Sequence, residues 1–245
     1  MLAIARKAAI RERLHEHKSV RITELAAELN VTKETIRRDL REMEQGGELI
    51  RTHGGAYILD GVQNDIDVGT RQVLKIPEKE RIAQKCDSII QSGDYIYLDG
   101  STTCWSIARK VSHRKLTVLT SSLEIANILS PFDTIKLHVI GGEFSPKNKD
   151  FVGEGAIKTL VRYFVYKAFI SCRSVHIRYG ITDTNDGRAR LHQTALEHAR
   201  EKYLVVDHSK LNNVSFSRIA PVTSVDGIIM DQEFPPEWTD YLTAH

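Results

Sequence analysis

The sequence has few of the features that mark secreted proteins, membrane proteins or metal-binding modules. Only three cysteines occur in 245 residues, and none has the CxxC spacing of a zinc site, so neither a disulfide framework nor a bound metal is expected. No apolar run approaches the roughly 18 residues of a membrane span. The opening MLAIARKAAIRERL lacks the apolar core of a signal peptide. We therefore expect a cytoplasmic protein with no membrane segment, no metal and no cofactor.

The net charge is also small. The 34 lysines and arginines nearly balance 32 aspartates and glutamates, which leaves a formal charge of +2. A chain this close to neutral does not coat nucleic acid along its whole surface, so any nucleic-acid binding must come from a local basic patch. The length suits one or two domains with a full hydrophobic core.

A candidate patch lies at residues 21–43, RITELAAELNVTKETIRRDLREM. Two groups of apolar residues have the spacing of one helix face: Leu25, Ala26 and Leu29, then Ile36, Leu40 and Met43. Between the groups, Asn30 tolerates the left-handed backbone of a tight turn, and Thr32 is a good N-cap. The pattern predicts two short helices joined by a turn, which is either a helix-turn-helix or an amphipathic hairpin with a solvated basic face.

The segment that follows favours the first alternative. Residues 46–56, GGELIRTHGGA, have the pattern of a strand, a tight turn and a second strand, which would form a wing beside the helices. Arg51 and His53 alternate with Ile50 and Thr52, so one wing face can meet DNA. The predicted DNA-contacting residues are Lys33, Glu34, Thr35, Arg37, Arg38, Arg51 and His53.

From residue 77 onward, short apolar strands alternate with amphipathic helices. Strands are predicted at 95–98, 116–120, 135–140, 167–170, 203–206 and 225–230, and helices at 78–91, 105–111, 123–129, 156–164, 191–202 and 236–242. This alternation predicts an α/β domain with a mainly parallel, twisted sheet. The expected organisation is a winged helix-turn-helix at 1–58, a polar linker at 59–76 and an α/β sheet domain at 77–245.

Polar residues gather where the predicted strands end. Open α/β sheets bind ligands beyond the carboxyl ends of their strands, and free N–H groups with hydroxyls there form an anion cradle. Each feature also has an ordinary explanation as a helix cap, a turn or a surface lysine. Together they favour a small anionic ligand, with these candidate contacts: Asp99, Gly100, Ser101, Thr102, Thr103, Ser121, Ser122, Gly141, Gly142 and Lys210.

The stretch TIRRDLREMEQGGELIRTHGGA resembles the N-terminal signature of the DeoR family of bacterial transcription regulators. The resemblance extends through the strand ends DGSTT, TSSL, GG and DHSK and covers nearly the whole chain. It implies a winged helix-turn-helix joined to an effector domain that is similar in fold to ribose-5-phosphate isomerase. The implied function is repression of a sugar catabolism operon by a dimer or tetramer on double-stranded operator DNA, under control of a phosphorylated sugar.

Three departures from the family pattern concern the effector domain. Tyr166 stands where an aspartate is common, and SCRSVHIRYG replaces a glycine-rich loop. Arg188 and His192 replace the usual glutamate and lysine, and both are added to the candidate effector contacts. The altered charges indicate either a more anionic ligand, such as a bisphosphate or a sugar-acid phosphate, or a pocket that no longer binds the usual ligand.

Two other function classes compete with this reading. A sugar-phosphate isomerase with a fused helical domain needs a general base and a partner acid, and Asp99 and Asp207 are the carboxylates at strand ends. Asp207, however, precedes the candidate ligand Lys210, and Asp99 sits in a turn that favours aspartate for backbone reasons, so an enzyme is not expected. An adaptor whose basic helix binds an acidic protein is the third class.

Overall fold

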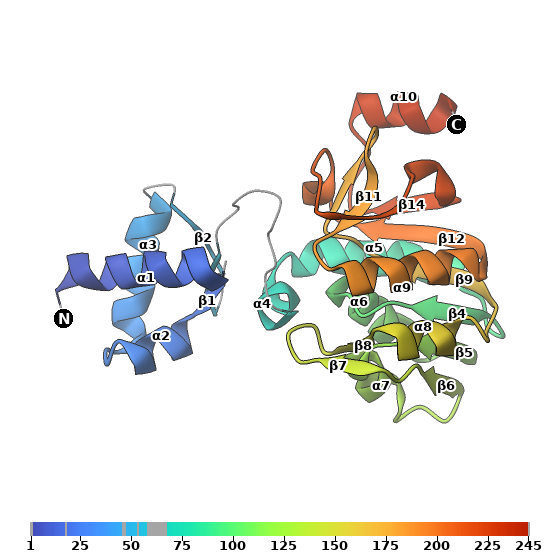
Figure 1. Cartoon of the computed structure of the whole chain (residues 1–245), viewed down its shortest axis with the longest axis horizontal. Coiled ribbons are helices and arrows are strands. Elements are labelled where there is room, and N and C mark those ends of the chain that lie inside the picture. The colour runs from blue at the N-terminus through green and yellow to red at the C-terminus, as the bar shows by residue number, and fades with distance from the viewer. Residues whose placement is uncertain (1, 18, 46–47, 53, 58–67, 245) are drawn as a thin grey trace. The chain divides into compact units, whose positions relative to one another are not determined.

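The computed structural model describes residues 2–17, 19–45, 48–52, 54–57 and 68–244 (Figure 1). The chain divides into two compact units, Met1–Ile76 and Pro77–His245. Each unit has its own cluster of buried apolar side chains. In the described part of the chain, no helix is both long enough and apolar enough to cross a membrane.

The first unit contains the predicted helix-turn-helix and wing. Its elements are α1 (Ala3–His17), β1 (Ser19–Arg21), α2 (Ile22–Glu28), α3 (Lys33–Gln45), β2 (Ile50–Arg51) and β3 (Gly55–Tyr57). The wing strands belong to an antiparallel sheet in the order β1-β3-β2, whose third strand, β1, was not predicted. Gly55 allows this pairing, because a Cβ there would lie only 1.9 Å from the carbonyl oxygen of Val20.

The turn between α2 and α3 forms as predicted. Asn30 has a φ of +50°, in the left-handed region that asparagine tolerates. The Oγ1 atom of Thr32 accepts a hydrogen bond from the N–H of Thr35 at 3.2 Å, which caps the start of α3. Ile36 and Leu40 are then fully buried, in one cluster with residues of α1 and α2.

A buried ion pair fixes α3 against α1. The guanidinium of Arg6 donates two hydrogen bonds to the carboxylate of Asp39, one of them from Nη2 to Oδ1 at 3.0 Å. Both residues are less than 5% exposed, and the pair raises the pKa of Arg6 further. Because the pairing is bidentate, it sets the rotation of α3 and therefore which residues α3 presents outward.

The second unit is built on a six-stranded parallel sheet in the order β14-β12-β9-β4-β5-β6, as Figure 1 shows. The strands are β4 (Tyr95–Leu98), β5 (Leu116–Thr120), β6 (Ile135–Val139), β9 (Val165–Ile170), β12 (Ala199–Val206) and β14 (Gly227–Met230). The chain extends the sheet in one direction from β4 to β6 and then in the other from β9 to β14. The order therefore reverses between β4 and β9, where open α/β sheets bind ligands.

The helices of the second unit are α5 (Ile76–Ile89), α6 (Thr102–Val111), α7 (Leu123–Leu129), α8 (Glu154–Leu160), α9 (Asp186–Glu197) and α10 (Pro236–Ala244). The predicted helix at 191–202 is wrong in position. Asn185 caps α9 early by accepting from the N–H of Arg188 at 2.9 Å. Residues 199–202, despite their helix-forming composition, pair with β9. Residues 59–67 of the predicted linker lie outside the described residues. The rest of the predicted linker contains a short helix, α4 (Val68–Val73).

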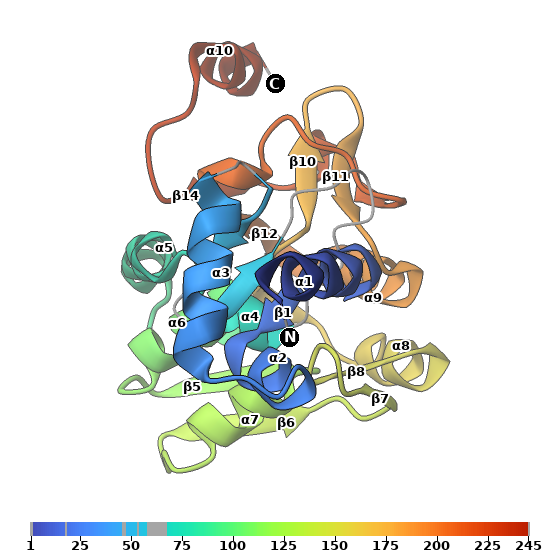
Figure 2. The ribbon, with the colours of Figure 1, turned by 90° about the vertical axis from the view of Figure 1, so that its left-hand side faces the viewer.

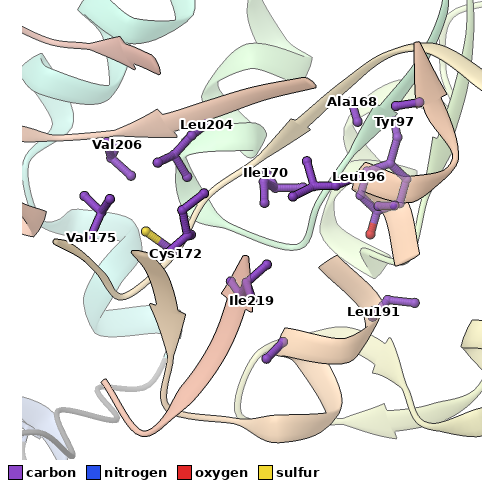
Figure 3. Packing of buried hydrophobic residues seen from close by; sticks show 14 of the residues in the cluster. Tyr97, Ala168, Ile170, Cys172, Val175, Leu191, Leu196, Leu204, Val206 and Ile219 are labelled. Carbon is purple, nitrogen blue, oxygen red and sulfur yellow. The ribbon is translucent and has the colours of Figure 1, made fainter. Parts of the chain in front are cut away.

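Two smaller sheets were not predicted. The first contains β10 (Ser174–His176), β11 (Gly180–Asp183) and β13 (Ser217–Ala220), and Figure 2 shows β10 and β11 projecting as a hairpin. Val175 of β10 and Ile219 of β13 belong to the same buried cluster as Cys172 and as Val206 of β12 (Figure 3). This cluster joins the small sheet to the main sheet. The second sheet is the hairpin of β7 (Glu143–Ser145) and β8 (Asp150–Val152).

We predict that Asp39→Ala lowers the unfolding free energy of the first unit by about 3–5 kcal/mol, because it takes the Asp39 carboxylate away from the buried Arg6 charge. Chemical denaturation followed by circular dichroism measures this loss. Glu42→Ala is the matched control: it removes the partner of Lys7, at 2.6 Å, from the exposed side of the same helix. Its expected cost is at most about 1 kcal/mol. Equal losses in the two variants would contradict the structural role of the Arg6–Asp39 pair.

Candidate functional site

Five of the seven predicted DNA-contacting residues lie on α3, and the other two belong to the wing. One side of the helix is buried and consists of Ile36, Asp39, Leu40 and Met43. The other side is exposed and carries Glu34 and four cations, Lys33, Arg37, Arg38 and Arg41. Thr35 is half-buried. Arg37 forms an ion pair with Glu34 at 3.0 Å. Among the described residues, Lys33, Arg38 and Arg41 have no ion-pair partner. Three cations on one exposed helix face are thus free to meet an external anion.

The basic residues of α1 differ in this respect. Lys7 pairs with Glu42, Arg11 pairs with Glu48 at 2.6 Å, and Arg13 pairs with Glu28, while Arg6 is buried against Asp39. Each positive charge on α1 is therefore compensated within the unit. The uncompensated positive charge of the described helices in this unit is concentrated on α3.

The wing residue Arg51 is attached to α3. Its Nε donates to Glu44 at 2.7 Å, and its backbone N–H donates to the same carboxylate at 3.1 Å. These hydrogen bonds lower the pKa of Glu44. The half-buried guanidinium thus connects β2 to α3, while the other predicted wing contact, His53, lies outside the described residues.

In the second unit, Asp99 stands at the point where the strand order reverses. Its side chain is fully buried, and its carboxylate accepts the N–H of Ser101 at 2.8 Å and the N–H of Ser171 at 2.6 Å. Ser101 follows β4 and Ser171 follows β9. One carboxylate therefore connects the carboxyl ends of the two central strands.

The serine hydroxyls at the strand ends serve as helix caps. Ser101 Oγ accepts the N–H of Cys104 at 3.1 Å at the start of α6. Ser122 Oγ accepts the N–H of Ile125 at 3.3 Å at the start of α7, and also the indole N–H of Trp105 at 3.2 Å. A hydroxyl has two acceptor sites and one donor. Both acceptor sites of the buried Ser122 hydroxyl are thus in use, and among the described residues its O–H donates to no partner, so it could donate to an anion.

The other predicted contacts at this edge differ in accessibility. Thr102, Thr103 and Ser121 are buried, and Lys210 is half-buried in the short helix η1 (His208–Lys210). A Cβ at Gly142 would lie 2.6 Å from the carbonyl oxygen of Val152, so packing against β8 already requires this glycine. Gly141, by contrast, faces open space.

The two replaced family positions, Arg188 and His192, both lie on the buried side of α9 and reach this edge. His192 Nε2 is 3.4 Å from the Asp99 carboxylate. Arg188 Nε is 3.8 Å from Oδ2 of Asp150, and its Nη1 is 4.0 Å from Oδ2 of Asp183. His192 Nδ1 is buried without a hydrogen-bond partner among the described residues, and such an atom marks a place for a polar ligand atom or a water.

Sequence reasoning missed two carboxylates of this neighbourhood, Asp150 and Asp183, and one cation, Arg173. Asp150 belongs to the unpredicted hairpin, and Asp183 ends the unpredicted strand β11. Burial alone would raise the pKa of Asp183, but Arg188, with His192 and Arg173, lowers it overall. The three polar residues DTN before α9 were the available signal, since Asp183 and Asn185 both accept backbone N–H groups there.

The Cys172 thiol is buried within the electrostatic reach of several of these groups. Burial raises its pKa, so the thiol stays protonated and unreactive. The charges of Lys210, Asp183, Asp99 and Asp207 all act on it. Lys210, which follows the predicted strand at 203–206, therefore acts on the same thiol as Asp99.

The structure corrects the prediction for Tyr166. Its ring lies 5.8 Å from the ring of Tyr95, in an edge-on arrangement, and about half of the side chain is exposed. Both tyrosines are near the amino ends of their strands, at the edge opposite to Asp99. The change at Tyr166 therefore does not alter the candidate effector site, whereas the changes at Arg188 and His192 do.

Comparison with known proteins covers both units. A model of the DeoR-like helix-turn-helix domain matches residues 6–62, and a model of the DeoR C terminal sensor domain matches residues 74–232. The chain is 35% identical over 236 residues to an uncharacterised HTH-type transcriptional regulator, YulB, of Bacillus subtilis (strain 168), covering 96% of this chain and 92% of that protein.

Two further proteins are similar over smaller parts of the chain. The lactose phosphotransferase system repressor of Staphylococcus aureus (strain N315) is 34% identical over 218 residues, which cover 88% of this chain and 86% of that protein. Ribose 5-phosphate isomerase A of Methanocaldococcus jannaschii superposes on 54% of this chain and 53% of its own, with a TM-score of 0.41 and 18% identity. From the two matched family models and its full-length relatives, the chain belongs to the DeoR family of transcription regulators.

Proposed function

We propose that this chain is a repressor of a sugar metabolism operon and that a phosphorylated sugar changes its affinity for double-stranded operator DNA. The observation that carries the proposal is the presence, in one chain, of an exposed helix with cations and a sheet edge that combines helix starts, hydroxyls and the buried cation Arg188. The relative named as a lactose phosphotransferase system repressor supports a role in sugar metabolism.

DNA recognition is assigned to α3. A recognition helix places donor side chains against base edges and neighbouring phosphates. Arg38 is the best candidate for a base contact because it is exposed and has no ion-pair partner among the described residues, and Lys33 and Arg41 suit phosphates. Arg37 and Arg51 are each held by a glutamate, so they are positioned either to keep the surface ordered or to exchange partners on DNA.

Effector binding is assigned to the carboxyl edge of β4, β5 and β12. The Ser122 hydroxyl and the first N–H groups of α6 supply donors, and Lys210 and Arg188 supply positive charge. Helix starts and hydroxyl donors bind phosphate well. His192 Nδ1 and the carboxylates nearby supply partners for sugar hydroxyls.

The proposed mechanism is linkage between the two units. If effector and DNA each bind better to a different arrangement of the protein, each changes the other's affinity, typically by about 1–3 kcal/mol. Operators read by helix-turn-helix proteins usually contain repeated half-sites, which requires at least a dimer. We therefore include self-association, as a dimer or a tetramer, in the proposal.

An isomerase remains the second candidate because the Asp99–His192 pair is one that proton transfer could use. The carboxylate of Asp99, however, already accepts two backbone N–H groups, which assigns it a structural role. The full-length relatives are also named as regulators. Turnover of a sugar phosphate by the purified protein, lost in Asp99→Ala, would establish the enzyme instead.

We predict that Arg38→Ala weakens specific operator binding by about 1–3 kcal/mol and relaxes sequence preference, because it removes a groove donor. Fluorescence anisotropy with a duplex selected by the protein from random DNA measures the change. Arg13→Ala removes the same charge from α1, where the guanidinium is paired with Glu28, and serves as the control. A loss in the control as large as that in Arg38→Ala would show a purely electrostatic effect and contradict the groove contact.

We predict that Lys210→Ala abolishes the response to effector while operator binding without effector is unchanged. The effector is identified first by thermal unfolding of the full chain against phosphorylated sugars and their free forms. A ligand at 100 times its dissociation constant stabilises the protein by about 2.7 kcal/mol. The matched control is Lys136→Ala, which removes an exposed lysine from β6. If Lys210→Ala retains the wild-type thermal shift, its ammonium is not a phosphate contact.

A further inference from the structure

Asp150 lies between two parts of the candidate effector site, Gly100 and Arg188. Its side chain is almost fully buried, although it is a carboxylate on a short hairpin. A Cβ added at Gly100 would lie 2.9 Å from both Cβ and Oδ2 of Asp150, so the carboxylate lies directly against the loop that follows β4. On the other side, the Arg188 guanidinium lies 3.8 Å from the same oxygen.

The backbone delivers this carboxylate to a fixed position. Residue 150 forms an antiparallel bridge with Ser122, the cap of α7. The N–H of Phe151 donates to the carbonyl of Ser121 at 2.8 Å, and the N–H of Leu123 donates to the carbonyl of Lys149 at 3.0 Å. The two hydrogen bonds, one on each side of Asp150, hold β8 along the loop that follows β5. Asp150 is thus brought to the strand-end loops by regular pairing.

The groups around Asp150 are those that would bind an anion. Gly100 precedes the start of α6, Ser122 has an O–H left to donate, and Arg188 carries a buried positive charge. Phosphate and carboxylate groups use the same donors. A carboxylate of the protein that already lies among these groups adds its own negative charge to the position and repels an incoming anion.

We propose that Asp150 is a specificity-determining residue of the effector site. Its carboxylate occupies the position of the bound anion and weakens the binding of small anions such as inorganic phosphate. A phosphorylated sugar displaces the carboxylate because its hydroxyls form further contacts, whereas inorganic phosphate has none to add. The inference rests on the proposed function, since it concerns the same site. It predicts that wild-type protein binds free phosphate weakly and that this one side chain is the cause.

The test is a titration of the full chain with inorganic phosphate at constant ionic strength, followed by tryptophan fluorescence and, separately, by thermal unfolding. Trp105 is a suitable reporter because its indole N–H donates to Ser122. Asp150→Asn keeps the size of the side chain and removes its charge. We expect this variant to bind phosphate at least about tenfold more tightly than wild type, as expected when a like charge about 4 Å away is removed.

The control is Glu154→Gln, which removes the same charge at the start of α8, where the carboxylate is exposed and pairs with Arg190 at 3.2 Å. It should bind phosphate as wild type does. Asp150→Ser gives the same comparison if the asparagine variant fails to fold, which circular dichroism detects. Unchanged or weaker phosphate binding in the folded Asp150 variant, or no binding by any variant, would overturn the proposal.

Operator binding of the same proteins distinguishes this inference from the proposed function. A wild-type chain that selects no DNA sequence would contradict the repressor proposal and would leave the phosphate comparison intact. A chain that binds operator normally, with no gain in phosphate affinity for Asp150→Asn, would contradict only the role of Asp150.

Discussion

The second unit depends on one buried carboxylate, that of Asp99. It accepts backbone N–H groups from the segments that follow β4 and β9, which are neighbours in the sheet but are separated by three helices and four strands in the chain. Because the strand order reverses between these two strands, their ends diverge and expose polar backbone. Asp99 pairs that backbone at a fixed spacing, and the cap of α6 and His192 of α9 are arranged around it.

A buried carboxylate also fixes the arrangement of the first unit. The buried Arg6–Asp39 pair orients α3, so the apolar residues of that helix face inward and its cations face outward. Glutamates compensate the neighbouring cations of α1 and the wing, which concentrates free positive charge on α3. A nearly neutral chain therefore presents one local basic surface, as sequence-specific DNA binding requires.

The sequence predicts those features that depend on local chemistry. The apolar spacing of α2 and α3, the left-handed turn at Asn30 and the cap at Thr32 are confirmed because each depends on a few adjacent residues. The parallel sheet is confirmed as well, since its strands are buried apolar runs. These signals also placed the polar strand ends at one edge of the sheet.

Features decided by distant contacts were missed. β10, β11 and β13 are only three or four residues long, and β13 pairs with a strand more than thirty residues away in the chain, so alternation is too brief to detect. Residues 199–202 have helix-forming side chains but extend β12, because pairing with β9 outweighs local preference. Asp150 and Asp183 lie on such unpredicted strands, which is why sequence reasoning found Arg188 but not the carboxylates beside it.

The central claim is that a sugar phosphate bound in the second unit changes the DNA affinity of the first. The most direct test is operator affinity, measured by anisotropy on a selected duplex with and without each compound of a sugar-phosphate panel. The account predicts that one phosphorylated sugar changes the affinity by about 5–150-fold and that its free form has no effect. An affinity that no phosphorylated sugar changes, in a protein shown to bind one of them, would contradict it.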